Sequence, residues 1–242
     1  MNILKQRLDK IISSQFNLTR SIARTVIRRG KVSVNGEIIR DAGMLIEPDK
    51  CSIVYGNEEL EYKKYVYLIM NKPKGVLSAS EDKNRKTVVD LVPENPKRNG
   101  LFPVGRLDKD TTGLMILTNN GQLAHALLSP KHHVQKEYFF TAAEPLKEGV
   151  EEHFREGVTL ADGYECKSAL ITLSPDRLSG NIILTEGKYH QIKRMLGALN
   201  NKIIYLERIS FGPLTLDKAL NRGEWRYLTE GETNLLKMGA YL

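Results

Sequence analysis

Cysteine is scarce in this sequence, and long apolar runs are missing. Cys51 and Cys166 are far apart and outside any Cys-x-x-Cys pair. This excludes a disulfide scaffold and a cysteine-based zinc site, and it favours the reducing cytosol. No stretch approaches the roughly 18 consecutive apolar residues of a membrane helix. Charged residues interrupt the N-terminal run MNILKQRLDKII, which argues against a secretory signal. We therefore expect a cytoplasmic protein with no membrane partner.

Sequence motifs for cofactors and metals are lacking as well. The chain has no Walker loop, no Gly-x-Gly-x-x-Gly and no histidines at metal-ligand spacing, so we expect no cofactor and no metal. Hydrophobic residues make up 41% of the 242 residues and charged residues 27%, which allows a packed core and excludes wholesale disorder. The length fits one ordinary domain with a small appendage.

Positive charge is concentrated near the N-terminus. The net charge of the chain is +7, and residues 1–57 hold ten basic and five acidic residues, a balance of +5. A compact basic module beside a nearly neutral body indicates a polyanionic partner. A basic face that is merely solvated would have the same composition, so charge alone leaves both interpretations open.

The first half of this basic module reads as two helices. Apolar residues at helical spacing predict a helix over residues 3–14. Thr19 is a candidate N-cap for a second helix, which ends before Gly30. The second helix carries arginines spaced by four residues, at Arg20, Arg24 and Arg28. Such an array suits a phosphate backbone, because the planar guanidinium matches phosphate oxygens.

A hairpin follows the helices. Asn35-Gly36, between two short apolar runs, is a strong two-residue hairpin signal, and a further strand is expected near residues 51–55. Residues 58–64 are charged and aperiodic, so they are interpreted as a linker. Together these features predict an N-terminal domain over residues 1–57.

Residues 65–242 have a different pattern, with many strands and few helices. Apolar runs bounded by turn residues predict strands at 65–70, 113–118, 137–142, 169–174 and 181–185. Helical periodicity predicts helices at 122–128 and 191–199. The expected fold class is α+β: a small domain followed by a larger one with a mixed, mostly antiparallel sheet.

The most informative segment is GRLDKDTTGLMILTNNG at 105–121. Its carboxylates could belong to an Asx-type turn. A calcium loop is excluded because its twelfth position is Asn119 and a strand follows it. A magnesium-dependent phosphotransfer nucleophile stays open, although no downstream carboxylate cluster is evident. The fourth alternative is a carboxylate that reacts with a nucleoside, which needs a cation to keep the buried acid ionised. Arg106 and the Lys193-Arg194 pair are the candidate cations.

The N-terminal elements together resemble the S4 RNA-binding module. The matching segments are RLDKII at 7–12, the arginine helix, and GKVSVNGEII at 30–39. Such modules bind structured RNA mainly through its shape and phosphates. The resemblance implies that five residues face RNA: Arg20, Arg24, Arg28, Lys31 and Asn35.

The rest of the chain resembles the RsuA family, the pseudouridine synthases that carry an N-terminal S4 module. GRLDKDTTGL resembles the family signature. Further matching segments are NKPKGVLSAS at 71–80, VQKEYFF at 134–140, EGKYHQIKRML at 186–196, and LERISFGPLTL at 206–216 with GEWRYLT at 223–229. The motifs occur in the family's order along essentially the whole chain.

The resemblance implies roles for individual residues. Asp108 is the catalytic carboxylate, Tyr138 the active-site tyrosine, and Lys193 the cation that pairs with Asp108. Arg106 belongs to the signature and is expected to contact RNA, within reach of Asp108 if both lie on one face of a strand. Arg194 is expected either to contact RNA or to form a structural pair. Lys72, Lys74 and Lys136 are further candidates for contacts along an RNA channel.

The activity implied is isomerisation of a uridine in ribosomal RNA, with the base flipped out of its helix. The reaction involves neither redox change nor hydrolysis, in keeping with the missing cofactor motifs. EGKYHQIKRM and the lack of a basic C-terminal tail are more similar to the small-subunit enzymes, so 16S RNA and a monomeric enzyme are expected. The alternatives are a large-subunit synthase and a non-catalytic S4-type RNA-binding assembly factor of the ribosome.

Overall fold

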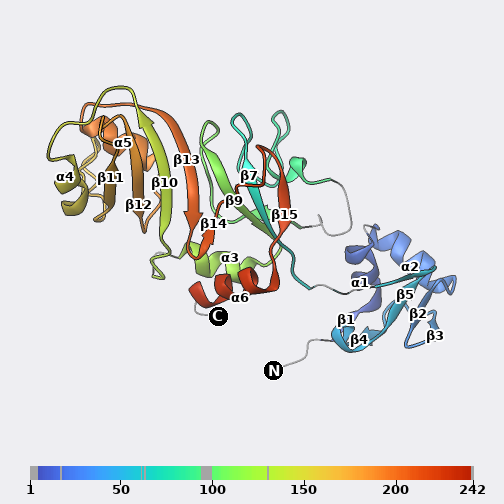
Figure 1. Cartoon of the computed structure of the whole chain (residues 1–242). Coiled ribbons are helices and arrows are strands. Elements are labelled where there is room, and N and C mark those ends of the chain that lie inside the picture. The colour runs from blue at the N-terminus through green and yellow to red at the C-terminus, as the bar shows by residue number, and fades with distance from the viewer. Residues whose placement is uncertain are drawn as a thin grey trace. The chain divides into compact units, whose positions relative to one another are not determined.

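The computed structural model describes residues 5–16, 18–60, 62, 64–93, 100–129 and 131–240. The described residues up to Val66 form one compact unit, and Tyr67–Val92 with the residues from Leu101 onward form a second (Figure 1). Within the described residues, no helix is long and apolar enough to cross a membrane.

Two helices of the first unit pack through their apolar stripes. α1 spans Leu8–Gln15 and α2 spans Arg20–Arg28, with Leu8, Ile11 and Ile12 of the former and Ala23 and Ile27 of the latter in one core. The Thr19 side chain accepts a hydrogen bond from the Ile22 amide at 3.2 Å, so the predicted cap of α2 is confirmed.

The first helix begins later than the expected 3–14. Residues 1–4 lie outside the described residues, and Gln6–Arg7 form strand β1, which pairs with β4 (Leu45–Ile46). The Leu8 amide then donates to the Met44 carbonyl oxygen at 2.9 Å. Strand pairing therefore holds the chain extended up to the first residue of α1.

A four-stranded sheet completes the first unit. Its strands are β2 (Val32–Val34), β3 (Glu37–Ile39), β5 (Ile53–Tyr55) and β6 (Glu58–Glu59), in the order β3-β2-β5-β6, and the 3-10 turn η1 (Pro48–Lys50) precedes β5. Asn35 and Gly36 have φ of 51° and 85°. Positive φ at both central residues is the geometry of a type I′ turn, so the predicted hairpin is confirmed.

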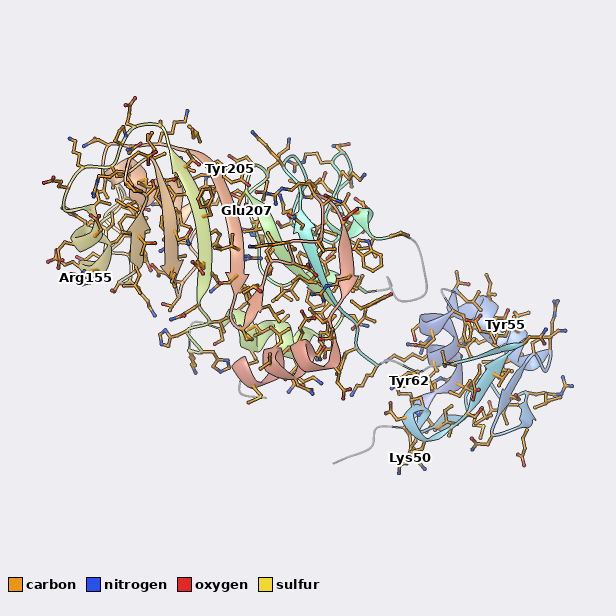
Figure 2. All side chains as sticks on the ribbon, viewed as in Figure 1. Lys50, Tyr55, Tyr62, Arg155, Tyr205 and Glu207 are labelled. Atoms are coloured by element: carbon orange, nitrogen blue, oxygen red, sulfur yellow. The ribbon has the colours of Figure 1, made fainter. Side chains whose placement is uncertain are left out.

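The first unit continues into the segment interpreted as a linker over 58–64. Glu58–Glu59 pair with β5 as strand β6, because Gly56 adopts a φ of 65° and turns the chain back. Tyr62 packs against the core of the unit, and its hydroxyl accepts from Gln6 Nε2 at 2.6 Å. Figure 2 labels Tyr62 together with Tyr55, whose ring meets Phe16 edge-on. The aperiodic pattern concealed this extension, since charged residues occupy the edge strand.

The second unit is built on one nine-stranded sheet. Seven strands follow the order β11-β12-β10-β13-β9-β7-β15, with β14 added to β13 and β8 to β9. The strands are β7 (Tyr67–Lys72), β8 (Phe102–Pro103), β9 (Thr112–Thr118), β10 (Lys136–Ala142), β11 (Leu170–Leu173), β12 (Ser179–Leu184), β13 (Ile203–Phe211), β14 (Leu214–Thr215) and β15 (Trp225–Tyr227). Only the β9–β13 pair in this sheet is parallel. The expected α+β class with a mostly antiparallel sheet is confirmed.

Helices cover this sheet at two places (Figure 1). α3 (Gly121–Leu128) and α6 (Glu230–Gly239) lie together below β9 and β13, and their apolar residues share a core with β7 and β9. α4 (Val150–Glu156) and α5 (Gln191–Ala198) lie near β11 and β12, and η2 (Val89–Leu91) is a single 3-10 turn.

The parallel pair β9–β13 places the site. Gly113, at φ 98°, lies opposite Arg208, and a Cβ atom there would stand 2.3 Å from the Arg208 carbonyl oxygen. Only glycine permits this approach of the two backbones. β9 is buried along all seven residues, so the turn that precedes it is anchored to the core of the sheet.

Candidate active site

The turn before β9 is fixed by contacts on both sides of Asp108. β7 ends at Lys72, which is fully buried, and its ammonium group donates to the carbonyl oxygens of Asp108 at 3.1 Å and Thr111 at 2.9 Å. The Ser78 hydroxyl donates to the Leu107 carbonyl oxygen at 2.8 Å and accepts from the Leu107 amide at 3.0 Å. The backbone at Asp108 is therefore held independently of its side chain.

Lys72 is thus a structural cation of the turn, and the expectation that it contacts RNA along a channel is wrong. It also donates to the carbonyl oxygens of Pro73 at 3.1 Å and Lys109 at 3.4 Å. Burial lowers the pKa of Lys72 to about 8, although the carboxylates of Asp110 and Asp108 act in the opposite direction. The sequence signal was a lysine at the end of a buried apolar strand, which rarely lies inside unless it has partners.

The carboxylate of Asp108 lies beside two groups at the start of α5. Lys193 Nζ is 3.0 Å from Asp108 Oδ2 and 2.6 Å from Asp110 Oδ1, and His190 Nε2 is 3.5 Å from Asp108 Oδ1. The side chains of Lys193 and Asp108 are 24% and 25% exposed. The fold therefore brings the expected carboxylate and the expected cation into contact from distant parts of the sequence.

The charges in this group favour the ionised forms. Burial acts to lower the pKa of Lys193, but hydrogen bonds to Asp110 and Asp108 outweigh it and raise that pKa. Burial acts to raise the pKa of Asp110, but its hydrogen bond with Lys193 and the charge of that ammonium bring it below the ordinary value. One ammonium thus serves two carboxylates, which leaves a net negative charge.

A cavity of about 80 Å³ opens beside Asp108. Its apolar walls come from Leu184, Ile192 and Leu206, and from Tyr138 on β10, which is 8% exposed. Asp110 is not part of this lining, so Asp108 is the carboxylate that faces the cavity. A carboxylate at the edge of an apolar slot suits a flat ring that has a polar rim.

Arg106 stands exposed and lines the same cavity as Asp108. The sequence suggested that the two residues share one face of a strand, but β9 begins only at Thr112, and both lie in the turn. Gly105, at φ 78°, turns the chain after β8. The turn still brings both side chains to one cavity, by a different local geometry.

A hydrogen-bond network around Glu186 fixes the loop before α5. The carboxylate accepts from Gln191 Nε2 at 2.5 Å, from the Tyr164 hydroxyl at 2.9 Å and from the Lys167 amide at 2.9 Å. Gln191, which is buried, also accepts from the Lys188 amide at 2.8 Å. This network positions the helix start that carries His190 and Lys193.

Arg194 takes a different direction from its neighbour Lys193. Its Nη2 lies 2.5 Å from Asp162 Oδ2, and it does not line the cavity. The structure thus gives Arg194 the structural pair that was one of its two expected roles.

In the first unit, three arginines converge on one buried acid. Asp9 is fully buried and accepts hydrogen bonds from Arg7 at 3.1 Å and Arg24 at 2.9 Å, while Arg20 Nη2 lies 3.8 Å from it. The hydrogen bond from Arg7 is the main reason that the pKa of Asp9 falls to about 2, against the effect of burial. The sequence analysis missed Asp9. Its signal was an acidic residue beside the apolar stripe of α1.

The other residues expected to face RNA have separate positions. Arg28 and Lys31 are exposed. Asn35 is exposed as well, but its side-chain oxygen accepts from the Ser52 amide at 2.9 Å, which ties the hairpin turn to the next strand. Asn35 therefore has a structural contact in addition to any contact with RNA.

The alternatives raised for the acidic turn fit this geometry less well. Asp108 and Asp110 share an ammonium group, whereas a magnesium site would bring further carboxylates to them. Among the residues that the structure describes, no group of three or more His, Cys, Asp or Glu side chains is arranged to hold a metal. A simple Asx turn does not require the Lys193 contact.

Comparison with known proteins agrees with this geometry. Residues 66–198 match the model of the RNA pseudouridylate synthase family, and residues 6–50 match that of the S4 domain. An uncharacterized RNA pseudouridine synthase of Bacillus subtilis is 42% identical, covering 95% of this chain and 98% of the relative. The ribosomal small subunit pseudouridine synthase A of Haemophilus influenzae is 38% identical over 95% of the chain, and that of Escherichia coli 37% over 93%.

A solved structure gives the same result. The crystal structure of a pseudouridylate synthase with 37% identity superposes with a TM-score of 0.67, covering 95% of this chain and 99% of that one. Coverage of this extent includes both units and all the motifs around Asp108. The chain therefore belongs to the RsuA family of RNA pseudouridine synthases, enzymes with an S4 domain followed by a pseudouridine synthase domain.

Proposed function

We propose that this chain converts one uridine of the small-subunit ribosomal RNA to pseudouridine, with Asp108 as the catalytic carboxylate. The observation that carries the proposal is the contact of 3.0 Å between Asp108 and Lys193 at the edge of the cavity. The choice of RNA is supported by relatives named ribosomal small subunit pseudouridine synthase A, which are similar over almost the whole chain.

The chemistry exchanges one bond of the ribose for another. The bond from C1′ to N1 of uracil breaks, a bond from C1′ to C5 forms, C5 loses its proton and N1 gains one. Nothing is oxidised or hydrolysed, so a single ionised carboxylate can carry the reaction. Lys193 keeps Asp108 negative within a partly apolar site, where an isolated acid would take up a proton.

The dimensions of the site imply that the uridine leaves its helix. A cavity of about 80 Å³ accommodates one base but no duplex, and extrusion of a nucleotide costs a few kcal/mol. Tyr138 contributes its ring to the wall, where it stacks on the base and holds its hydroxyl near the moving ring. Arg106, exposed at the same cavity, is placed to contact the RNA from which the nucleotide departs.

The test is Asp108→Asn, which keeps the shape of the side chain and removes its charge. Small-subunit RNA transcribed with [5-³H]uridine releases tritium when C5 loses its hydrogen. We expect release to fall by about 100-fold or more, while RNA binding measured by filter retention stays within about twofold. Asp176→Asn, a matched change in the turn before β12, should retain full activity.

Two outcomes would contradict the proposal. Tritium release by Asp108→Asn at the rate of the unaltered enzyme would remove Asp108 from catalysis. Binding without release by the unaltered enzyme would favour the non-catalytic assembly factor. The choice of RNA is tested separately by mapping pseudouridine in cells with and without the gene: loss of one modification from the large subunit instead would overturn the small-subunit assignment.

A further inference from the structure

A second cavity adjoins the one at Asp108 and has no part in the chemistry proposed above. It measures about 300 Å³ and shares Arg106, Tyr138, Gly187 and Lys188 with the smaller cavity. Its size lies at the lower end of the range of roughly 300–1,000 Å³ seen for small-ligand sites. A ligand that spans both cavities would be longer than a single base.

The lining of this second cavity is strongly basic. One acidic residue, Glu186, faces five basic residues: Arg106, Lys136, Lys167, Lys188 and Arg208. The carboxylate of Glu186 is already engaged by Gln191, Tyr164 and the Lys167 amide. The cavity therefore presents an excess of positive charge to whatever enters it.

Two of these cations are withdrawn from solvent without a matching anion. Arg208 is 2% exposed and donates to the Leu114 carbonyl oxygen at 2.8 Å, and Lys136 donates to the Val134 carbonyl oxygen at 2.8 Å. Both lie over the ring of Phe211, at 5.2 and 5.6 Å from its centroid. Within the part of the chain that the structure describes, neither makes an ion pair with a carboxylate.

This arrangement is unfavourable in the free protein. Burial lowers the pKa of Lys136 to about 8, and repulsion by Arg208 adds to that effect. A buried cation with only neutral partners destabilises the folded state, because its lost hydration is incompletely replaced. An anion in the cavity would supply the missing charge, and RNA carries one phosphate for every nucleotide.

We propose that the second cavity binds the nucleotide next to the target uridine, with its phosphate against Lys136 and in the positive field of Arg208. This inference rests on the proposed function, since it assumes that a uridine occupies the smaller cavity. Tyr164, at the rim, offers a ring on which an unstacked base can lie. The site then holds two consecutive nucleotides, and Tyr138 lies between them as a shared wall.

The experiment replaces Lys136 by methionine, which keeps the length and removes the charge. Lys147→Met removes the same charge from an exposed position of the same unit and serves as the control. Each protein is titrated with tritiated small-subunit RNA at several salt concentrations, and single-turnover release is followed at saturating RNA. Thermal unfolding is recorded for all variants.

We expect Lys136→Met to weaken RNA binding by about 10-fold, equivalent to 1.4 kcal/mol, with the saturated rate within about twofold of the unaltered enzyme. The slope of log affinity against log salt should fall by ~0.7, the value for one phosphate of a single strand. The melting temperature should stay the same or rise, because an unpaired buried charge has been removed. A residue that serves only to stabilise the fold would lower it.

A modified RNA identifies the phosphate directly. A neutral methylphosphonate placed at each linkage around the target uridine should weaken binding of the unaltered enzyme at one linkage and have no further effect there on Lys136→Met. Unchanged affinity and salt slope in Lys136→Met, or equal losses in Lys147→Met, would overturn the proposal. Failure of the proposed function shows differently, as absent tritium release by the unaltered enzyme, whereas the salt slopes still test the second cavity.

Discussion

In the S4 unit one buried carboxylate, Asp9, faces three arginines, whereas in the synthase unit several buried cations lie among carbonyl oxygens and aromatic rings. Charge at Asp9 is matched where the helices meet, and the arginines keep about half of their surface exposed. Lys72 and Arg208 are almost fully buried and are bound by neutral groups.

The difference separates two uses of buried charge. A matched cluster such as the one at Asp9 holds elements in place and turns arginine side chains into an ordered surface. An unmatched cation stores an attraction for an anion that the protein itself does not provide. The synthase unit places such cations around the cavities at Asp108, where an anionic polymer is the substrate. Both uses serve RNA binding, one by order and the other by imbalance.

The largest expected effect concerns the one cation of the synthase site that is matched. Lys193→Met should lower the single-turnover rate of tritium release by about 100-fold, because Asp108 would lose the ammonium group that keeps it ionised. Lys193→Arg should recover part of the rate, since it restores the charge with a different shape. Rates are measured at saturating RNA. An unchanged rate in Lys193→Met would show that the 3.0 Å contact is incidental.

Lys72 provides the next test, because it is unmatched but satisfied by hydrogen bonds. Lys72→Met should reduce the free energy of unfolding by about 2 kcal/mol, since four carbonyl oxygens of the turn would lose their donor. Urea denaturation measures the loss, and Lys74→Met, at an exposed neighbouring position, is the control. A more stable Lys72→Met protein would mean that the burial of its charge outweighs these four contacts.

Asp9 gives the opposite case, a matched charge in the S4 unit. Its pKa is about 2 when folded and 3.8 ordinarily, so it contributes stability above pH 4 that is lost as the pH falls through 2. The contribution is about 2 kcal/mol at neutral pH. Asp9→Asn should lower the stability of the S4 unit by this amount and remove that part of the acid dependence. Unfolding monitored between pH 2 and 7 would refute the assignment if both proteins showed the same dependence.

The sequence predicted the elements that have regular patterns. Five strands and two helices of the synthase unit lie within about two residues of their expected bounds, and the hairpin at Asn35-Gly36 is confirmed. β13 was not expected, because Glu207 and Arg208 interrupt its apolar pattern. α6 has only one buried apolar residue, Leu236, and thus little periodicity. Its capping box, Thr229 with Glu232, was nevertheless a readable signal.

The candidate site was predictable only in part, for a physical reason. Residue types and a family resemblance indicated Asp108, Tyr138 and Lys193, and the structure shows that these three line one cavity. The role of Lys72 depends on where four carbonyl groups point, and the role of Asp9 depends on how two helices cross. Neither quantity is encoded in a local pattern, so burial had to be observed before these charges could be interpreted.

The smallest expected effect distinguishes arginines that the sequence treated alike. Arg24 binds Asp9, whereas Arg28 is exposed and lies outside that cluster. Arg28→Glu should reduce the slope of log RNA affinity against log salt by ~0.9 with unchanged stability. Arg24→Glu should reduce the slope similarly but also destabilise the S4 unit, since it places a second carboxylate beside the buried one. Equal stability of the two variants would show that the matched cluster does not order the arginine surface, and an unchanged slope for Arg28→Glu would show that this arginine is merely solvated.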